Sequence, residues 1–389
     1  MKIPKITGLF YITHIENIPS ILRNGILSHE RILNEKIPYT PIYNEQIVTN
    51  RKKILAPDGR NLWNFANLYF QPRNPMLYRV LHEKQTNEVA IIAIQPIVLE
   101  RPDIYFSTGN AAHSASNILH AIELKKEMGQ IVRNTVKVEW WNDLNGSKRK
   151  IMAECLVPDV VNPDLIQAIY VGSRNAKETV EAGNPGLRLP IITEPLMFFL
   201  PSKGFSLTSN LRVAEGDMFF SRMQTLTVSV NVVGIMGAGL ASRAKYQFPD
   251  VYVYYQDLCR NRKLHMGKPQ LYKREASLEH ELADEPSSLL NADLAKWFLL
   301  FPTKRHWRDR ADIKGIEEGL QWLVNNYKKE SIKSLAIPAL GCGLGKLEWR
   351  DIGPLMCKYL RTMDVTVSIY LPAEHKVPDE ELSKDFLLA

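Results

Sequence analysis

Two glycine-rich turns, each directly after a run of apolar residues, constrain the fold of this chain most strongly. The first spans Val230–Leu240 and the second spans Ile337–Leu344. Glycine tolerates positive φ and lets backbone N–H groups approach a ligand closely. One such loop is explained by a tight strand-to-helix turn without any ligand. Two loops that face each other can hold a diphosphate between their N–H groups, so the pair predicts an anion-binding site at strand ends.

The second half of the chain alternates apolar strands with amphipathic helices. Strands are expected at residues 226–233, 295–301, 335–338 and 365–371, and helices at 240–248, 313–327 and 350–363. This alternation predicts an α/β unit with a mixed sheet flanked by helices on both faces. Ligands of such sheets bind outside the carboxyl ends of the strands, where both glycine turns fall.

The first half has a different pattern. A short helix at residues 18–24 ends at Gly25, and buried strands are expected at 90–99, 164–171 and 194–200. The long irregular stretch 30–75 is typical of functional loops. We therefore expect an α+β domain with a mixed sheet around a cleft. Turn residues at 200–212 place the boundary, giving domains 1–205 and 206–389. The acidic segment 274–286 is expected to be an exposed insertion.

Length, charge and cysteine usage limit the class of protein. A chain of 389 residues predicts two domains. Residues 1–205 carry 24 Lys and Arg against 19 Asp and Glu, which suits a polyanionic partner but equally fits a slightly basic protein. The four cysteines form no CxxC pair, which argues against a zinc site or disulfides and fits a reducing cytoplasm. We therefore expect no metal. We also expect no membrane association, because no signal sequence or spanning apolar run is present.

The second half resembles a macrodomain, the fold that binds ADP-ribose. The resemblance rests on Gly216-Asp217, on Asn231 at a strand end, on both glycine loops and on the segment Phe301–Arg308. It implies that Asp217 accepts a hydrogen bond from adenine and that Asn231 faces the distal ribose. The implied loop residues around the ligand are Gly234, Gly237, Gly239, Gly341, Cys342, Gly343 and Leu344. A helix-capping role is the alternative for Asp217.

Lys304 is the candidate catalytic residue of the second half. Its surroundings match DarG proteins and related eukaryotic hydrolases that remove ADP-ribose through a lysine. A free amine can attack the ring-opened C1″ aldehyde of ribose as a Schiff base, provided that its pKa is lowered. Simple pairing with phosphate is the alternative. The eukaryotic enzymes place an aspartate after Gly-Cys-Gly-Leu, whereas this chain has Gly345, so the lysine–aspartate pair is missing. No histidine stands at a spacing that would make Cys342 a nucleophile.

Residues 5–200 resemble the DarT family, bacterial toxins that transfer ADP-ribose from NAD onto bases of single-stranded DNA. The resemblance is carried, in order, by Leu9–Ile26, Asn50-Arg51, Leu68–Tyr78 and Ile151–Pro158. DarG is the usual antitoxin partner and removes the same modification. The resemblance therefore implies a fused toxin and antitoxin, with NAD as co-substrate, single-stranded DNA and ADP-ribose as partners and thymidine as the target base. Whether the two domains contact or block one another within the chain stays open.

The DarT resemblance assigns residues that also make chemical sense. Glu154 could stabilise an oxocarbenium-like ribose and take a proton from the attacking base. Arg51 corresponds to the family's catalytic arginine. The implied NAD-binding residues are Thr13, His14, Asn24, Gly25, Arg51 and Tyr69. The alternatives are an exposed strand carboxylate for Glu154, a solvated basic run at Arg51–Lys53, and a core histidine for His14.

Tyr69, Phe70 and Arg73 are expected near the nicotinamide pocket or the DNA groove, although core packing is favoured for Phe70. Two rival functions remain for the whole chain. One is an RNA-modifying or RNA-repair transferase whose macrodomain only binds ADP-ribose. The other is a degenerate protein that binds NAD or ADP-ribose without catalysis, against which the presence of Arg51, Glu154 and Lys304 argues.

Overall fold

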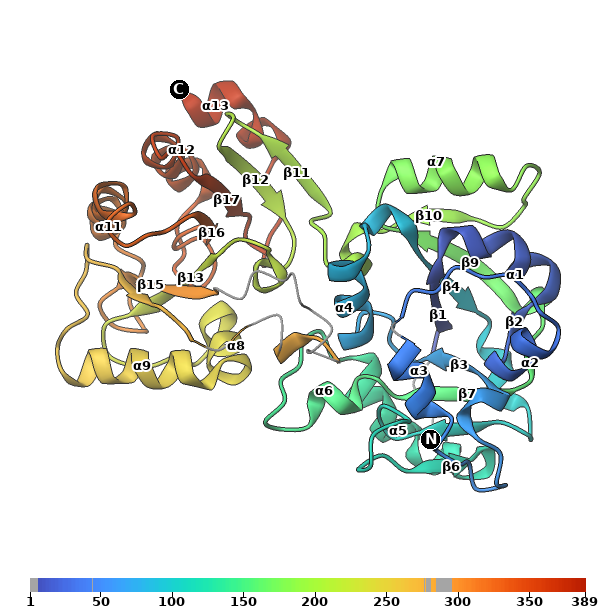
Figure 1. Cartoon of the computed structure of the whole chain (residues 1–389). Coiled ribbons are helices and arrows are strands. Elements are labelled where there is room, and N and C mark those ends of the chain that lie inside the picture. Colours follow the sequence, from blue (N-terminus) through green and yellow to red (C-terminus); the bar gives the residue numbers. More distant parts are fainter. Residues whose placement is uncertain (1–5, 44, 276, 278–280, 285–295) are drawn as a thin grey trace. The chain divides into compact units, whose positions relative to one another are not determined.

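The computed structural model describes residues 6–43, 45–275, 277, 281–284 and 296–389 (Figure 1). The chain divides into two compact units, of which the first comprises Met1–Phe198 and Glu279–Ala292 and the second comprises the rest. The division falls at Phe198, before the expected boundary at 205, because β11 (Lys203–Ser206) pairs with β12 (Leu211–Glu215) in the second unit's sheet.

The first unit is built on an eight-stranded sheet. Its spatial order is β10 (Ile191–Thr193), β9 (Ile166–Val171), β4 (Val89–Ile94), β1 (Leu9–His14), β3 (Phe65–Tyr69), β7 (Glu154–Pro158), β5 (Tyr105–Ser107) and β6 (Ile118–His120). Neighbours pair antiparallel except for β10 and β9, which are parallel. A separate ladder joins β2 (Ile26–Leu27) to β8 (Val160–Val161). The expected mixed sheet is therefore present, with β1, β3 and β7 near its middle.

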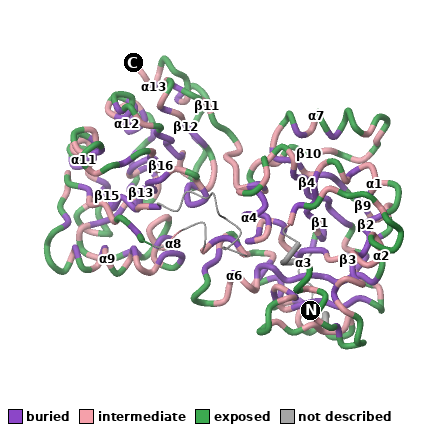
Figure 2. Tube along the Cα trace, viewed as in Figure 1, coloured by how far each residue is buried: buried purple, intermediate pink, exposed green. Residues whose placement is uncertain are grey.

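Helices of the first unit surround this sheet. They are α1 (Ile18–Asn24), α2 (His29–Asn34), α3 (Glu45–Arg51), α4 (Pro75–Glu83), α5 (Ala121–Ile131), α6 (Ser147–Lys150) and α7 (Arg174–Gly183). Helix α1 has the predicted bounds because Gly25 terminates it with φ of +82°, where a Cβ would lie 2.3 Å from the carbonyl oxygen of Val161. Strand β4 is buried along its whole length (Figure 2), as its unbroken apolar run predicts, and β7 is buried in the same way.

The second unit has a seven-stranded mixed sheet. Its order is β11, β12, β17 (Thr366–Tyr370), β16 (Ser334–Pro338), β13 (Thr225–Asn231), β15 (Trp297–Lys304) and β14 (Gln270–Tyr272). The five inner strands are parallel, and the two edge strands are antiparallel to their neighbours. The carboxyl ends of β13, β15 and β16 therefore meet at one edge of the sheet, as the alternating sequence pattern predicts.

Helices cover both faces of this second sheet (Figure 1). They are α8 (Gly239–Gln247), α9 (Pro249–Arg260), α11 (Ile313–Asn326), α12 (Trp349–Leu360) and α13 (Lys384–Leu388). On one face, Gly319 of α11 packs so closely on Phe301 that a Cβ would lie 2.6 Å from the ring. On the other face, the ring of Phe248 lies 5.0 Å from that of Phe298. The predicted arrangement of helices on both faces of a mixed sheet is confirmed.

Three local expectations differ from the structure. Residues 194–200 are not a strand, because Pro195–Phe198 form a 3-10 helix that still buries Phe198. In the run 90–99 the strand ends at Ile94, and a 3-10 helix begins at Pro96, because proline has no N–H to donate to the sheet. Residues 281–284 of the acidic segment are not exposed, since Leu282 and Ala283 are buried. Residues 276, 278–280 and 285–286 lie outside the described part.

Candidate active sites

Arg51 and Glu154 form a two-point ion pair in the first unit. Arg51 is the last residue of α3, and Glu154 is the first residue of β7. The guanidinium donates from Nη2 to Oε2 at 2.8 Å and from Nη1 to Oε1 at 3.2 Å. Burial lowers the pKa of Arg51, but the charge and hydrogen bonds of Glu154 outweigh it, so the pKa is raised. Two residues that are 103 positions apart in the sequence thus form one ion pair. The Glu154 side chain is 0% exposed, so it is not the exposed strand carboxylate of the alternative interpretation.

The loop after β5 also holds Glu154. The backbone N–H of Ala111 donates to Oε1 at 3.0 Å, and the N–H of Glu154 itself donates to Ser107 Oγ at 3.0 Å. The Ser107 hydroxyl in turn donates to the carbonyl of Gly109 at 2.6 Å. These contacts orient a buried carboxylate through main-chain groups, which is how a preorganised site keeps its geometry. No sequence pattern pointed to this loop.

A cavity of about 260 Å³ opens beside the ion pair. Its walls include Thr13, Gly25, Arg51 and Tyr69 of the predicted set, together with Met76, Arg79, Asn110 and Met152. Tyr69 lies opposite Glu154 in the β3–β7 ladder, and burial followed by the charge of Glu154 raises the pKa of its phenol. Tyr69 therefore stays protonated as a hydrogen-bond donor. Four of the six residues implied for NAD are brought together here.

The other two implied NAD residues lie elsewhere. His14 is nearly buried at the end of β1, where its Nδ1 accepts the backbone N–H of Glu16 at 3.3 Å and caps a 3-10 turn. Asn24 is exposed, and its amide donates to Ser20 Oγ at 3.2 Å. Neither is among the described residues that line the cavity. Phe70 packs in the core as expected, and Arg73 donates to the carbonyl of Glu139 at 2.7 Å.

An aromatic cluster that sequence reasoning did not single out forms another wall of the cavity. His29 packs edge-on against Trp63 with ring centroids 4.2 Å apart, and Tyr39 and Tyr43 lie 6.2 and 6.3 Å from it. Burial lowers the pKa of His29, which favours the neutral ring. All four residues lie in or next to the stretch 30–75, which was expected to be a long irregular loop. The structure instead places α2, α3 and β3 in this stretch, so the expectation of irregular structure was wrong. Such aromatic faces suit stacking on a nucleobase or nicotinamide ring.

In the second unit, the two glycine loops meet at the carboxyl edge of the parallel strands. The first follows β13 and the second follows β16, which is hydrogen-bonded to β13. Gly234, Gly239 and Gly341 all have positive φ. A Cβ on Gly239 would lie 3.3 Å from Leu344 of the second loop, so the loops approach each other there. The predicted juxtaposition of the loops is present.

Asn231 shapes the first loop from within. Its Nδ2 donates to the carbonyl of Ile235 at 2.6 Å, and its Oδ1 accepts the N–H of Val233 at 3.1 Å. The buried hydroxyl of Tyr255 lies 2.9 Å from both Oδ1 and the backbone carbonyl of Asn231. The side chain is thus engaged in loop structure, where the sequence suggested contact with ribose.

Lys304 ends β15, the strand beside β13, and its Cα pairs with that of Asn231. Its Nζ donates to the carbonyl of Leu344 at 3.2 Å, and to those of Trp307 and Asp309 at 3.4 and 3.3 Å. Burial lowers the pKa of Lys304, opposed by Asp309 and assisted by Lys346. The candidate amine therefore lies at the second glycine loop with the direction of pKa shift that nucleophilic use requires.

Gly345 and Cys342 have structural reasons for their identity. A Cβ on Gly345 would lie 2.4 Å from the carbonyl oxygen of Gly341 and 2.8 Å from Cβ of Ala311, so no aspartate fits there in this loop conformation. Burial, followed by the charge of Glu348, raises the pKa of the Cys342 thiol to about 12. A thiolate is thereby disfavoured, which agrees with a packing role for Cys342.

Asp217 caps the 3-10 turn Met218–Phe220 and also pairs with Arg243. Its Oδ1 accepts the N–H of Phe219 at 3.1 Å, and its Oδ2 accepts Arg243 Nη1 at 2.8 Å. The guanidinium lies over the ring of Phe219 at 4.8 Å, and its Nη2 is buried without a hydrogen-bond partner among the described residues. Arg243 and Phe219 were not predicted, and they extend the Asp217 group beside the first loop.

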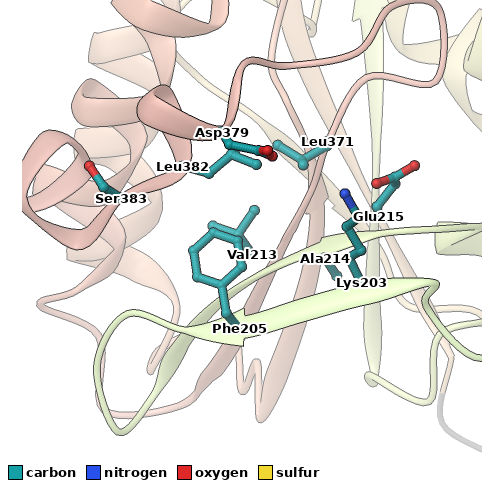
Figure 3. Close-up of a pocket in the computed structure, with 9 residues that line it drawn as sticks. All are labelled: Lys203, Phe205, Val213, Ala214, Glu215, Leu371, Asp379, Leu382 and Ser383. Atoms are coloured by element: carbon teal, nitrogen blue, oxygen red, sulfur yellow. The ribbon is translucent and has the colours of Figure 1, made fainter. Parts of the chain in front are cut away.

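A further cavity, of about 270 Å³, lies in the second unit at β11 and β12 (Figure 3). Phe205, Val213, Leu371 and Leu382 give it apolar walls, and Lys203, Glu215 and Asp379 add charge. None of the residues predicted to bind ADP-ribose lines it, so the glycine loops and this cavity are separate features. Among the described residues no helix is long and apolar enough to cross a membrane.

Comparison with known proteins agrees with this division. The family model described as "ssDNA thymidine ADP-ribosyltransferase, DarT" matches residues 10–199, and the "Macro domain" model matches residues 287–356. A fusion protein of Thermosipho africanus, named "DNA ADP-ribosyl transferase-DNA ADP-ribosyl glycohydrolase fusion protein", is 53% identical over 389 residues, covering 99% of each chain.

Two further matches cover nearly the whole chain and part of it, respectively. The solved structure "Thermosipho africanus DarTG in complex with ADP-ribose" matches with a TM-score of 0.94 at 53% identity, covering 98% of this chain and all of the other. A "DNA ADP-ribosyl glycohydrolase" of Thermus aquaticus is 31% identical over 166 residues, which are 42% of each protein.

Proposed function

This chain belongs to the family of fused DNA ADP-ribosyl transferases and DNA ADP-ribosyl glycohydrolases, and we propose that it attaches ADP-ribose to DNA and removes it again. The first unit transfers ADP-ribose from NAD to the base of a thymidine in single-stranded DNA. The second unit hydrolyses the product. The observation that carries the proposal is the buried Arg51–Glu154 pair at the cavity of the first unit.

The transfer step uses the buried carboxylate at the point where positive charge develops. The bond between C1″ of the distal ribose of NAD and the nicotinamide nitrogen breaks, and nicotinamide leaves with the bonding electrons. The ribose becomes oxocarbenium-like, and Glu154, which is buried, stabilises it electrostatically. A ring nitrogen of the base then attacks C1″ and loses its proton to the carboxylate. Ala111 and Ser107 keep the carboxylate in place, and Arg51 balances its charge.

The cavity walls fit the two parts of the reaction. Thr13, Gly25 and Tyr69 would contact NAD, because they line the cavity beside the ion pair. The rings of His29, Tyr39, Tyr43 and Trp63 would stack on planar groups of the substrates. Gly25 has no alternative among the other residues, since its positive φ and the nearby carbonyl of Val161 exclude a side chain.

The second unit would hold ADP-ribose at its paired glycine loops, with the diphosphate on the N–H groups of residues 234–239 and 341–344. Lys304 would attack C1″ of the modified ribose with its free amine, and the base leaves with the electrons of the C1″–N bond and takes up a proton. The ribose ring then opens to an imine with Lys304, and water hydrolyses the imine to return ADP-ribose and the free amine. The lowered pKa of Lys304 supports this role over simple phosphate pairing, and its hydrogen bond to the carbonyl of Leu344 holds the amine at the second glycine loop.

Mass spectrometry of oligonucleotides tests both activities. The full chain carrying Lys304→Ala is incubated with NAD and either single-stranded DNA or RNA of the same sequence. We expect ADP-ribose adducts on thymidine of the DNA, and none when Glu154→Gln is added to the same chain. A chain with Glu154→Gln alone should then remove the adducts. Adducts on RNA only would favour the RNA-modifying alternative, and the absence of any adduct would contradict the proposal.

A further inference from the structure

Asp284 lines the transferase cavity, although it comes from an unexpected place in the sequence. Residues 281–284 lie between β14 and β15, two neighbouring strands of the second unit, yet they group with the first unit. Leu282 and Ala283 are buried, and the carbonyl of Leu282 accepts the indole N–H of the buried Trp141 at 3.0 Å. This hydrogen bond and the burial of Leu282 and Ala283 hold the adjoining Asp284 at the cavity.

Asp284 pairs with Arg79 inside the cavity wall. Arg79 Nε donates to Oδ1 of Asp284 at 2.7 Å, and Nη1 donates to Glu83 at 2.9 Å. Arg79 is 1% exposed and the Asp284 side chain 7%, so water screens the pair weakly. Asp284 lines the same cavity as Arg51 and Tyr69, and its negative charge acts on both.

The charges at this wall disfavour an anion. Arg51 is balanced by Glu154, while the single positive charge of Arg79 faces the two carboxylates of Glu83 and Asp284. The group of five side chains therefore carries one net negative charge. Arginine is the side chain best suited to bind phosphate, and here its fork is directed at carboxylates instead. Both proposed substrates of the cavity carry phosphates.

We propose that Asp284 is an affinity-setting residue of the transferase, which occupies Arg79 and so weakens binding of substrate phosphate in the cavity. A residue encoded within the glycohydrolase half of the sequence thereby restrains the transferase. The ligand chemistry is a phosphate group, whether it belongs to NAD or to the DNA backbone. This inference rests on the proposed assignment of the cavity to these two substrates.

The test compares full chains with Asp284, Asp284→Asn and, as a matched control, Glu275→Gln. Asparagine keeps the shape of Asp284 but removes its charge, which weakens its hold on Arg79. Glu275 is an exposed carboxylate nine positions away, and Glu275→Gln removes the same charge. Binding of a labelled oligothymidine is followed by fluorescence anisotropy without NAD, and NAD binding is followed by calorimetry without DNA. Neither arm requires turnover. Asp284→Ser provides the measurement if the asparagine chain does not fold.

We expect Asp284→Asn to raise affinity roughly three- to tenfold at low salt in at least one arm, as removal of one poorly screened like charge predicts. If the phosphate belongs to DNA, the slope of log affinity against log salt should steepen by about 0.7, the value for one added contact on a single strand. A gain in the NAD arm alone assigns the phosphate to NAD. Glu275→Gln should change neither.

Unchanged affinity in both arms would overturn the inference, and so would a loss, because a loss would mean that Asp284 holds Arg79 in a binding geometry. These outcomes differ from failure of the proposed function, in which the chain with the natural Asp284 would bind neither NAD nor single-stranded DNA.

Discussion

A side chain at Gly345 should damage the second glycine loop, and the size of the effect follows from the contacts around it. A Cβ there would lie 2.4 Å from the carbonyl oxygen of Gly341 and 2.8 Å from both Gly341 Cα and Ala311 Cβ. None of these atoms can rotate away, because two belong to backbone and the third is bound to it directly. The carbonyl of Gly345 also accepts the N–H of Ala311 at 2.9 Å, which ties the loop to the segment after β15.

Gly345→Ala must therefore move backbone. Overpacking a well-packed site costs about 1–3 kcal/mol, and loss of the Ala311–Gly345 hydrogen bond adds about 1 kcal/mol. We expect the second unit to lose roughly 2–4 kcal/mol of its free energy of unfolding. ADP-ribose affinity should fall as well, because the same backbone shift displaces the N–H groups of residues 341–344. Gly345→Asp should behave no better, so restoring the eukaryotic acid would not restore a lysine–aspartate pair.

Hydrogen–deuterium exchange of peptides from β16 and α12 in a urea series reports the second unit by itself, which avoids the two-state assumption for a two-unit chain. Gly237→Ala is the matched control, because the nearest atom to its Cβ is 3.8 Å away and its φ is not positive. The control should stay within about 1 kcal/mol of the unsubstituted chain. If Gly345→Ala were as stable as Gly237→Ala, the steric account of the missing acid would be wrong.

Three further predictions concern the two reactions. Glu154→Gln should lower the transfer rate by at least about 100-fold while NAD affinity changes little, because the lost interaction belongs to the transition state; single-turnover kinetics would contradict this if NAD affinity fell in parallel. Lys304→Arg should retain ADP-ribose binding in calorimetry but lose hydrolysis. The hydrolysis rate of the unsubstituted chain should rise with pH through a pKa below the usual 10.5 of lysine, because the free amine forms there. Full hydrolytic activity of the Lys304→Arg variant would show that Lys304 acts through its charge and not as a nucleophile. In growth assays the Lys304→Ala chain should be more toxic than the unsubstituted chain, and adding Glu154→Gln should abolish that toxicity; persistent toxicity of the double variant would separate toxicity from transfer.

Local sequence patterns predicted most of the secondary structure. Helix α1 has its predicted bounds because Gly25 reaches a conformation that other residues avoid. The strands and helices around both glycine loops were predicted to within a few residues because apolar periodicity and glycine turns are short-range signals. Residues 194–200 were misread because an apolar run with one proline fits a buried strand and a buried 3-10 turn equally well.

The sequence by itself determined which residue types are available at the two sites, and the DarT and macrodomain resemblances placed Arg51, Glu154 and Lys304. Only tertiary structure decided how these residues are held. Glu154 meets Ser107 and Ala111 because β7 lies beside β5, and α3 brings Arg51 to the same carboxylate; no local pattern encodes these adjacencies. The aromatic wall and the Arg79–Asp284 pair arise in the same way, the latter across 205 positions. The physical reason is that propensity and periodicity act over a few residues, whereas ion pairs and cavity walls depend on packing between distant segments.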